Sequence, residues 1–592
     1  MTIYRAPVRD IEFVLNEVIG FDKLTNLPRF SDATPDLVRA ILEEGAKLAE
    51  NELHPLNFSG DKEGCTRDDD GNVTPPKGFK EAYKTYSENG WNALSGPVEY
   101  GGQGLPGTMA MAFNEMTMAA NMAFSMYPGL SHAAAAAIEA HGDDRQKKLF
   151  LPKMFSGEWT GTMNLTEPHC GTDLGLLRTK AEPQADGTYK ITGTKIFISA
   201  GEHDMSENII HLVLARLPDA PEGVKGISLF IVPKFAVSGD GVVGDRNAVK
   251  CGSIEEKMGI HANSTCVMNY DGAVGELIGE PHKGLRAMFT MMNEARIGVA
   301  VQGLGQSEVA YQNAAAYAND RLQGRALTGP QEADKPADPL IVHPDVRRML
   351  MEQRAFNEGA RALIYQATLW ADLSIHHPDE AERDHADDMM ALLTPVLKGY
   401  FTDKGFENAV NAQQIFGGHG FIQEHGMEQF VRDARISMIY EGANGVQALD
   451  LVGRKLALKG GQVFMAYVAK LRESIEAAKA TDGLADMANA QAVAVDRFEE
   501  GFKWFMENAL NDFNHAGAGS VDFMHLMGVV ALGDMWLQMA IVSAAKKGET
   551  FYDNKLAIAA YFFARVTPET GARLAKLQTG AETVMALPAD QF

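Results

Sequence analysis

Two segments of the sequence combine residue types that could hold a ligand. In residues 165–173 (LTEPHCGTD), threonine and aspartate flank proline and glycine, so hydroxyls and free backbone N–H groups could face a flavin ring or a phosphate. In residues 414–421 (QIFGGHGF), three glycines within four positions indicate a close backbone approach or a left-handed backbone. Each segment has an ordinary alternative, a turn for the first and a helix-terminating loop for the second. The second segment lacks the G-x-G-x-x-G pattern and a clear preceding strand, so it does not predict a Rossmann fold.

A third segment offers a group that could move a proton. Glu441 stands between Tyr440 and Gly442, shortly after the pair Arg432-Asp433. If this loop packs against an apolar pocket, desolvation raises the pKa of the carboxylate and makes it a stronger base toward a buried carbon acid. The alternative is a solvated loop residue, which is the commoner role of a glutamate before a glycine.

The elements that must position these segments are helical at both ends of the chain. The N-terminal part predicts mainly helix, including a Met- and Ala-rich stretch at 109–137, with a polar surface loop at 59–77. Helical periodicity returns at 284–459, where residues 330–344 form a loop between long helices. A further helical region follows the glycine pair at 460–461.

The middle of the chain predicts strands instead. Residues 189–199 alternate and carry β-branched and aromatic side chains, while 209–215 and 227–232 are short apolar runs bounded by glycine, proline or charges. The sequence therefore predicts an α+β multidomain protein. Its predicted parts are an N-terminal extension (1–34), an N-terminal α-helical domain (35–160), a middle β-domain (161–281), a C-terminal α-helical bundle (282–460) and an additional C-terminal α-helical domain (461–592).

The charge and cysteine content exclude several classes of function. The chain has 592 residues, with 54 Lys and Arg against 78 Asp and Glu, which gives a net charge of −24. This acidic balance argues against a nucleic-acid binder and against a protein that binds anionic membranes. The four cysteines form no C-x-x-C pair and share no spacing with histidines, so we expect no disulfide framework, no metal site and a reducing compartment.

The sequence also predicts a cytoplasmic protein. Residues 1–7 lack the basic start and the apolar run of a secretory signal. No uninterrupted apolar run reaches about 18 residues, the length that a membrane span needs. The nearest candidate, 525–545, contains Asp534 and predicts a buried helix.

Eight motifs, taken in order and with their spacing, resemble the acyl-CoA dehydrogenase family over roughly residues 35–460. The motifs are Gly90-Trp91 with Pro97 and Gly101-Gly102, Leu151-Pro152 with Ser156-Gly157-Glu158, the 165–173 segment, Gly193-Thr194-Lys195 with Ile198-Ser199, Arg321-Leu322-Gln323, the 414–421 segment, Arg432-Asp433, and Tyr440-Glu441-Gly442. The resemblance implies FAD and the α,β-dehydrogenation of an acyl-CoA thioester. In that reaction a glutamate removes the α-proton and the β-hydrogen leaves as hydride to the flavin.

The resemblance also implies roles for residues around the substrate. Glu441 matches the catalytic base, and Tyr440 and Gly442 would lie beside it in the substrate site. Arg296 and Asn293 match the family's contact to the coenzyme A side. The alternative for Arg296 is a salt bridge on a helix surface.

A second position for the base is known in a branched-chain-type subgroup of the family, on the residue immediately before the match to Arg296. That position is Ala295 here, and Glu294 is one residue away, about 100° around a helix. The sequence therefore favours Glu441.

For FAD, the resemblance implies two sets of residues. The set around the ring and ribityl chain is Met163, Leu165, Thr166, Gly171, Thr172, Phe197 and Ser199. The set at the adenylate end of a neighbouring subunit's FAD is Arg321, Gln323, Gln414, Gly417 and Gly418. Arg321 suits a pyrophosphate because its planar fork can donate in pairs. A site that spans subunits implies at least a dimer.

The sequence departs from the family pattern at three places. Many members have tryptophan where Phe197 stands, and phenylalanine covers a flavin edge without donating an N–H. Ala443 and Gly445 replace the usual threonine and glutamine after the Glu-Gly pair. Gly324-Arg325 replaces the usual Phe-Gly, which changes the local loop.

Residues 4–15 and the C-terminal helical extension resemble a long bacterial subgroup of the family. One class of that subgroup oxidises 3-(methylthio)propanoyl-CoA to 3-(methylthio)acryloyl-CoA in dimethylsulfoniopropionate catabolism, which implies that substrate here. The methionines of one stretch suit a pocket for a thioether, although most of them could equally fill the core. They are Met109, Met111, Met116, Met118, Met122 and Met126. Glu115 could limit the acyl length or be a surface charge.

The resemblance implies electron-transferring flavoprotein as the electron acceptor and a homodimer or larger assembly. Three alternatives stay open: a short- or medium-chain fatty acyl-CoA dehydrogenase, an acyl-CoA oxidase with oxygen as acceptor, and a non-enzymatic assembly or scaffold protein. Retention of Glu441 and Arg296 argues against the last. The C-terminal extension could cap a dimer interface or bind a membrane, and Asp512 and Asp534 argue against the membrane.

Overall fold

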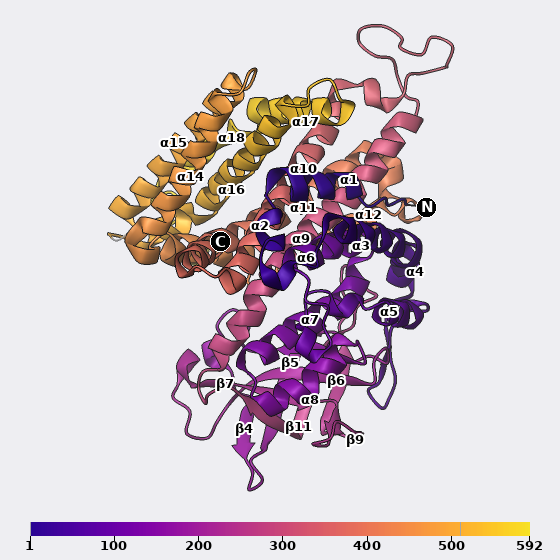
Figure 1. Cartoon of the computed structure of the whole chain (residues 1–592), viewed down its shortest axis with the longest axis vertical. Helices are drawn as coiled ribbons and strands as arrows, with labels where there is room; N and C mark the ends of the chain where they lie inside the picture. Colours follow the sequence, from indigo (N-terminus) through magenta and orange to yellow (C-terminus); the bar gives the residue numbers. More distant parts are fainter. Residues whose placement is uncertain (1, 510) are drawn as a thin grey trace. The chain divides into compact units, whose positions relative to one another are not determined.

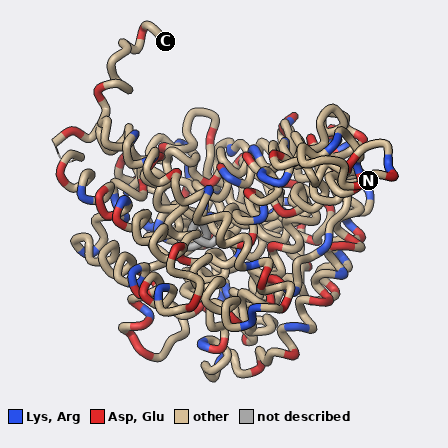
Figure 2. The backbone as a smooth tube through the Cα atoms, turned by 90° about the horizontal axis from the view of Figure 1, so that it is seen from above, with Lys and Arg blue, Asp and Glu red and all other residues tan. Residues whose placement is uncertain are grey.

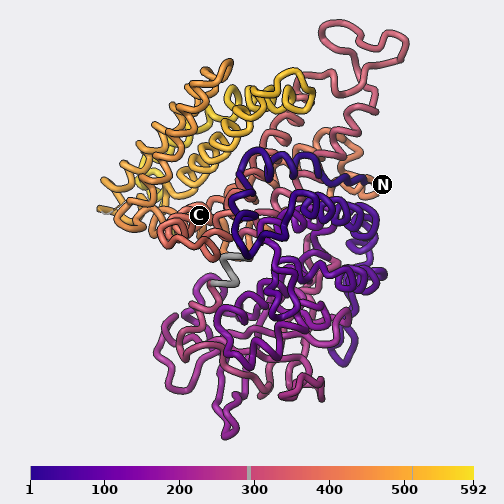
Figure 3. Tube along the Cα trace, viewed as in Figure 1, coloured from indigo at the N-terminus to yellow at the C-terminus, as the bar shows by residue number. Residues whose placement is uncertain are grey.

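The structure is a computed structural model that describes residues 2–509 and 511–592, apart from the side chains of residues 290–294 (Figure 3). The chain divides into two compact units. The αβ unit is Glu43–Gly298, and the helical unit combines Met1–Leu42 with Val299–Phe592. Figure 1 shows the sheet of the αβ unit and the long helices of the helical unit, so the predicted α+β architecture is confirmed.

The helices of the αβ unit differ in two places from the sequence prediction. They are α4 (His54–Glu63), α5 (Phe79–Glu88), α6 (Gly107–Ala120), α7 (Met122–His141) and α8 (Asp144–Phe155). The stretch at 109–137 is two helices, because Asn121 leaves the helical backbone and its side chain accepts the N–H of Phe124, which caps α7. The predicted loop at 59–77 contains the end of α4 and a ribbon of β1 (Thr66–Arg67) and β2 (Val73–Thr74).

The main sheet of the αβ unit has seven strands in the order β10-β11-β5-β4-β6-β3, with β7 pairing to both β11 and β6. The strands are β3 (Trp159–Asn164), β4 (Lys180–Pro183), β5 (Tyr189–Ser199), β6 (Asn208–Arg216), β7 (Ile227–Pro233), β10 (Val249–Ile254) and β11 (Thr265–Ile278). A separate ribbon joins β8 (Phe235–Val237) to β9 (Val243–Arg246). The three strands predicted from the sequence are confirmed as β5, β6 and β7.

The sheet is covered on both faces where it lies beside the candidate ligand loop. Leu212 and Leu214 of β6 pack into one core cluster with Phe150 of α8, whereas Val213 and Ala215 pack into a second cluster. Alternate residues of a strand point to opposite faces, so β6 contributes to both cores. Burial on both faces explains why 209–215 is apolar apart from the buried His211.

The helical unit holds the rest of the helices. They are α1 (Val8–Phe13), α2 (Asp22–Thr25), α10 (Pro344–His376), α11 (Glu380–Ile415), α12 (Met427–Ile436), α13 (Asn444–Asp450), α14 (Gln462–Lys479), α15 (Ala485–Asn508), α16 (Phe513–Ala544), α17 (Thr550–Tyr561) and α18 (Glu569–Leu577). Two more, α3 (Pro35–Leu48) and α9 (Gly284–Asp320), contain residues of both units. The loop predicted at 330–344 is longer, since α9 ends at Asp320 and α10 begins at Pro344. Lys459 and Gly460 leave the helical backbone before α14, which confirms the predicted break.

The most apolar element of the helical unit is α16. Of the helices that the structure describes, it alone is long and apolar enough to cross a membrane, and 83% of its most apolar window is buried. Asp534 lies in the middle of α16 and accepts hydrogen bonds from Lys470 Nζ (2.7 Å) and Gln538 Nε2 (2.9 Å). The helix is therefore a core element, as its Asp534 predicts from the sequence.

The N-terminal segment is tied to α17 by buried charges. Asp10 of α1 pairs with Lys555 of α17 and, at 2.6 Å, with Arg361 of α10. Arg9 donates to the hydroxyl of Tyr552 at 2.9 Å. Figure 2 shows segments with Lys and Arg interspersed with segments with Asp and Glu along the backbone.

Candidate active site

The Glu441 loop, residues 437–443 between α12 and α13, has a left-handed backbone at its centre. Glu441 has φ +57° and Gly442 has φ +85°. A non-glycine residue in this conformation costs about 1–3 kcal/mol and persists only where its surroundings enforce it. Gln447 of α13 supplies part of that enforcement, because its Nε2 donates to the backbone carbonyls of both Glu441 and Gly442 at 3.2 Å. The side chain of Glu441 is half-buried, which does not fit the alternative of a fully solvated loop residue.

Asn444, the first residue of α13, anchors the end of the Glu441 loop to α11. Its Oδ1 accepts a hydrogen bond from the buried Lys398 Nζ at 2.8 Å. Its Nδ2 faces three acceptors, the carbonyl of Gly399 (3.0 Å), Thr402 Oγ1 (2.9 Å) and Asp403 Oδ1 (2.7 Å). A cation on one side of the amide and a carboxylate on the other fix its orientation.

Tyr440 is held on the other side of the candidate base. Its hydroxyl donates to Gln302 Oε1 of α9 at 2.6 Å. Burial raises the pKa of the Tyr440 phenol, and the negative charge of Glu441 adds to the rise. Tyr440 is therefore neutral, and its hydroxyl proton is donated to Gln302. Glu441 is then the residue of the Tyr-Glu-Gly motif that can ionise.

The 165–173 loop of the αβ unit stands on a buried ion pair. Glu167 and Lys195 are 3% and 0% exposed, and Lys195 Nζ lies 2.9 Å from both Glu167 Oε1 and the carbonyl of Leu165. Burial lowers the pKa of Lys195 to about 8 against the opposing effect of Glu167. Burial by itself would raise the pKa of Glu167, but the charge of Lys195 and hydrogen bonds from Thr179 and Arg178 hold it below its usual value. Sequence analysis placed Lys195 in a motif but missed this pairing.

Of the seven residues predicted around the flavin ring, three are exposed, three are half-buried and one is buried. Gly171 and Thr172 are exposed, and Thr166 is half-buried, with its carbonyl accepting the N–H of Ile196 at 2.9 Å. Phe197 is 59% exposed and has φ +59°. Among the described residues only six non-glycine residues have a positive φ, and two of them, Phe197 and Glu441, are predicted site residues.

The remaining predicted ring residues sit deeper. Leu165 is half-buried, and the carbonyl of Ser199 accepts a hydrogen bond from Thr162 Oγ1 at 2.7 Å. Met163 is buried, and its side chain packs in the core cluster that contains Phe150. Only the backbone of Met163 is therefore left to meet a ligand.

The two segments predicted at the adenylate end come together through Tyr317, which the sequence analysis did not single out. Tyr317 lies in the last turn of α9, and its carbonyl accepts the N–H of Arg321, the residue after the helix, at 2.8 Å. Its hydroxyl is 2.8 Å from His419 Nδ1, and its ring stacks on Phe416 at 4.0 Å. Arg321, Gln323, Gln414, Gly417 and Gly418 are all exposed. An aromatic residue four positions before an arginine was the available signal.

The loop after α9 is closed around a buried carboxylate, Asp338. Gln323 donates its N–H to the Asp338 carbonyl, and Asp338 donates its N–H to the Gly324 carbonyl, both at 2.9 Å. Hydrogen bonds from the backbone of Ala326 and neighbouring residues hold the pKa of Asp338 well below its usual value. Arg325, the departure from the family pattern, lies 3.2 Å from Asp338 Oδ1. It therefore helps to close the loop that carries Arg321 and Gln323.

For two residues the structure excludes one of the alternatives that the sequence left open, and a third residue falls outside the description. Arg296 is 9% exposed, so it is not the salt bridge on a helix surface that stood as its alternative. Glu115 of α6 is 0% exposed, which excludes the surface-charge alternative for it. Asn293, together with Glu294, belongs to the stretch of α9 whose side chains lie outside the described residues. Five of the six methionines singled out in 109–126 are buried, and Met111 is half-buried.

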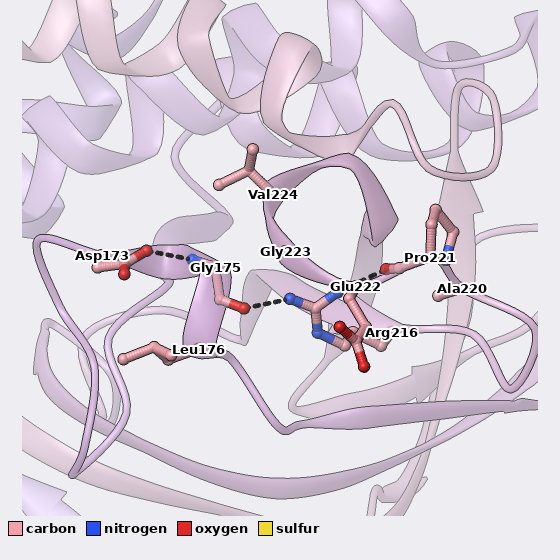
Figure 4. A pocket seen from close by; sticks show the side chains of 9 residues that line it. All are labelled: Asp173, Gly175, Leu176, Arg216, Ala220, Pro221, Glu222, Gly223 and Val224. Atoms are coloured by element: carbon pink, nitrogen blue, oxygen red, sulfur yellow. Dashed lines mark hydrogen bonds between the residues drawn. The ribbon is translucent and has the colours of Figure 1, made fainter.

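A hollow of ≈ 510 Å³ opens beside the 165–173 loop (Figure 4). Asp173, Gly175 and Leu176 line one side, and residues 220–224 line the other. Arg216 joins the two sides, because it donates to the carbonyls of Gly175 (2.7 Å) and Pro221 (3.1 Å). Asp173 in turn accepts the N–H of Gly175 at 2.9 Å. Arg216 thus braces the segment that follows the loop.

Comparison with known proteins identifies the family of the chain. Four domain-family models match: Acyl-CoA dehydrogenase, N-terminal domain (38–158), middle domain (162–273) and C-terminal domain (282–456), and Acetyl-CoA dehydrogenase C-terminal like (466–588). The chain is 44% identical over 590 residues to the 3-methylmercaptopropionyl-CoA dehydrogenase of Ruegeria pomeroyi, covering 98% of this chain and 99% of that protein. It is 33% identical over 616 residues to a butyryl-CoA dehydrogenase of Syntrophomonas wolfei, covering 100% and 99%.

The fold is shared with a solved acyl-CoA dehydrogenase from Bacillus anthracis that is complexed with FAD. The TM-score is 0.75 at 21% sequence identity, over 93% of this chain and 89% of that one. The family models together span most of the sequence, and the relative from Ruegeria pomeroyi matches it nearly from end to end. The chain belongs to the acyl-CoA dehydrogenase family.

Proposed function

We propose that the protein is an FAD-dependent acyl-CoA dehydrogenase that converts 3-(methylthio)propanoyl-CoA to 3-(methylthio)acryloyl-CoA. The observation that carries this proposal is the left-handed backbone of Glu441, which is held by a hydrogen bond from Gln447. Glu441 lies in the motif where the family has its base. Backbone strain of this kind is concentrated at active sites, where surrounding contacts enforce it. The 44% identical relative from Ruegeria pomeroyi supports the choice of acyl group.

The residues present fit FAD at both of its ends. Thr166, Thr172 and Ser199 offer hydroxyls, and the ring of Phe197 is exposed, which suits a flat heterocycle with many acceptors. At the other end, Arg321 and Gln323 would hold the adenylate portion of a neighbouring subunit's FAD together with Gln414, Gly417 and Gly418, all of which are exposed. When bound, FAD supplies the acceptor for the β-hydrogen, which leaves with its electron pair.

The protein's own part in the reaction is to take a proton. The thioester acidifies the α-carbon, and the Glu441 carboxylate forms an O–H bond as the α-C–H bond breaks. The electron pair left on the α-carbon becomes the new α,β double bond. The hydrogen bonds of Gln447 hold the backbone at Glu441 and Gly442, and those of Asn444 hold the chain just after them, so the carboxylate starts from a defined position. Arg296 is proposed to hold the coenzyme A side, with Asn293, and Tyr440 and Gly442 to flank the acyl group.

Several finer points belong to the same proposal. We propose a homodimer or larger homo-oligomer, with electron-transferring flavoprotein as acceptor, acting in the cytoplasm in dimethylsulfoniopropionate catabolism. The five predicted domains, with boundaries near residues 34, 160, 281 and 460, are proposed as the units of this enzyme. Neither nucleic acid nor a membrane is part of the proposal, in keeping with the charge of −24 and the burial of α16.

The base is tested by Glu441→Gln, which keeps the shape of the side chain but cannot take a proton. We expect flavin-loaded protein whose flavin is reduced by 3-(methylthio)propanoyl-CoA about 10²–10⁴-fold more slowly than in the wild type. The measurement is anaerobic stopped-flow bleaching of the flavin. The control is Glu473→Gln, on the exposed side of α14. Reduction at the wild-type rate in Glu441→Gln, or a protein that binds no FAD, would refute the proposal.

The acyl group is tested in the same experiment with a second substrate. Because a butyryl-CoA dehydrogenase is also a full-length relative, butyryl-CoA is the informative competitor. We expect a higher kcat/KM for the methylthio compound, and a higher value for butyryl-CoA would reassign the substrate to short-chain acyl groups. Formation of hydrogen peroxide in air at the rate of turnover would identify an oxidase instead.

A further inference from the structure

The additional C-terminal helical region lies against the support of the candidate base. Within the helical unit, α16 packs on α11 and α13, the two helices that hold the end of the Glu441 loop. The approach to α11 is close at Gly399, where an added Cβ would lie 2.4 Å from Met524 Sδ of α16. Gly399 is also the residue whose carbonyl accepts from Asn444. Residues of α16 therefore reach the anchor of the loop directly.

A polar chain continues this contact from α16 to the loop. His525 of α16 has its Nε2 2.8 Å from Asp403 Oδ2 of α11. The other oxygen of the same carboxylate, Oδ1, accepts from Asn444 Nδ2 at 2.7 Å. Asn444 follows Glu441 by three residues. One carboxylate thus joins the C-terminal region to the residue that ends the Glu441 loop.

The chemistry of the groups assigns a donor and an acceptor to each hydrogen bond of this polar chain. An ionised Asp403 only accepts, so the Nε2 of His525 carries the proton that it donates. The ring of His525 is packed edge-on against Tyr400 at 5.2 Å, which limits its rotation. Its Nδ1 is buried without a hydrogen-bond partner among the described residues. A buried polar atom left unpaired is costly, so packing alone is a poor reason for a histidine at this position.

We propose that His525 is a positioning residue for Glu441, acting through Asp403 and Asn444. The inference rests on the proposed role of Glu441 as the base. His525 holds one oxygen of Asp403, so that the other oxygen meets Asn444 Nδ2, while Lys398 holds Asn444 Oδ1. With its amide fixed at both ends, Asn444 sets where the Glu441 loop ends. The additional C-terminal region thereby tunes the rate of proton abstraction without contacting the substrate.

The test compares two substitutions at the same position. His525→Leu removes the donor to Asp403, whereas His525→Gln keeps an N–H donor of similar reach. Removing the hydrogen-bond partner that orients a metal ligand costs about 10–100-fold in metal affinity or activity, and we expect a loss at the lower end of that range for a group that orients a base. For His525→Leu we therefore expect flavin reduction about 10-fold slower, with FAD content unchanged and the substrate dissociation constant within about 2-fold. His525→Gln is expected to recover the rate to within about 3-fold of the wild type.

The matched control is Asp534→Asn, on the same helix. It removes the charge partner of Lys470 but touches neither Asp403 nor the Glu441 loop. We expect a less stable protein whose flavin, once bound, is reduced at the wild-type rate. Both stability and rate are measured on the full-length, flavin-loaded enzyme, by chemical unfolding and by stopped-flow bleaching.

Each outcome decides between the two proposals. If His525→Leu reduces its flavin at the wild-type rate while Glu441→Gln does not, the positioning role is overturned and the base assignment stands. If His525→Gln is as slow as His525→Leu, or Asp534→Asn is equally slow, the effect is a general loss of packing and the positioning role is again overturned. If Glu441→Gln itself reduces its flavin normally, the proposed function fails first.

Discussion

The 165–173 loop and the Glu441 loop are stabilised by different kinds of interaction. Beneath the first, the charges of Glu167 and Lys195 are paired in the core, and the residues proposed to meet the flavin are presented above them. Around the second, side-chain amides of Gln447 and Asn444 hold the backbone, and the nearby cation Lys398 is bonded to Asn444. A ligand platform needs only rigidity, whereas a base must stay free to gain a proton, and a close cation would lower its pKa. A buried ion pair thus lies beneath the loop proposed to meet the flavin, whereas side-chain amides contact the backbone around the proposed base, and the charges of Lys398 and Asp403 act one step further away, on Asn444.

The largest effect that follows from this difference is expected for Lys195→Met. The substitution leaves Glu167 buried without its charge partner, which typically destabilises a protein by about 3–5 kcal/mol. FAD retention after dialysis should fall with it, because Lys195 also donates to the carbonyl of Leu165 in the loop. Chemical unfolding of the two proteins measures the change. A double variant, Glu167→Gln with Lys195→Met, should recover part of the loss, and equal stability of Lys195→Met and wild type would contradict a supporting role for charge.

A smaller loss of stability and a larger loss of rate are expected for Asn444→Ala. The substitution removes neutral and charged hydrogen bonds at one point of α11, and each buried group left unpaired costs about 1–3 kcal/mol. Since it frees the end of the Glu441 loop, flavin reduction by acyl-CoA should slow by about 10–100-fold while FAD stays bound. Stopped-flow bleaching and flavin content are the two measurements. Asn508→Ala on α15, which loses a single bond to the carbonyl of Trp504, is the control.

The pattern of results across the two loops is what separates the explanations. Lys195→Met should lower FAD retention more than the rate of flavin reduction, and Asn444→Ala should lower the rate of flavin reduction more than FAD retention. The reverse order in either variant would mean that the two loops share one support.

Local patterns predicted the elements of the fold, and distant pairings escaped them. The alternating pattern of side chains over 189–199 predicted both ends of β5 correctly, because the two-residue period of a strand is visible in a short stretch of sequence. The split of the stretch at 109–137 was missed, since it depends on Asn121 capping the helix that follows. Likewise, the loop after α9 is longer than predicted. Gln323 and Gly324, which follow the helix, form backbone hydrogen bonds with Asp338 in place of a further helical turn.

The sequence shows the motifs that contain the candidate site residues, but it does not show the distant residues that hold those motifs in place. Glu441, Phe197 and Arg321 follow from motifs, and the first two have the left-handed backbone that active sites concentrate. The pair Glu167–Lys195 is separated by 28 residues, and His525 and Asp403 by 122. No periodicity links residues at such separations, so only the folded chain brings them together.

The smallest expected effect is a pH dependence that distinguishes the two supports. The pKa of Glu167 is held below its ordinary value of 4.5, so the stability that it contributes is complete above pH 4.5 and is lost as the pH falls through its lower value in the folded protein. Glu167→Gln resembles the protonated acid. Its deficit in unfolding free energy should therefore shrink as the pH falls below 4.5, because only the wild type then loses the charge of Glu167. The deficit of Asn444→Ala involves an amide that does not titrate, and it should change less over the same range. Chemical unfolding at a series of pH values measures both deficits, and parallel curves for the two variants would show that charge does not distinguish the platform from the support of the base.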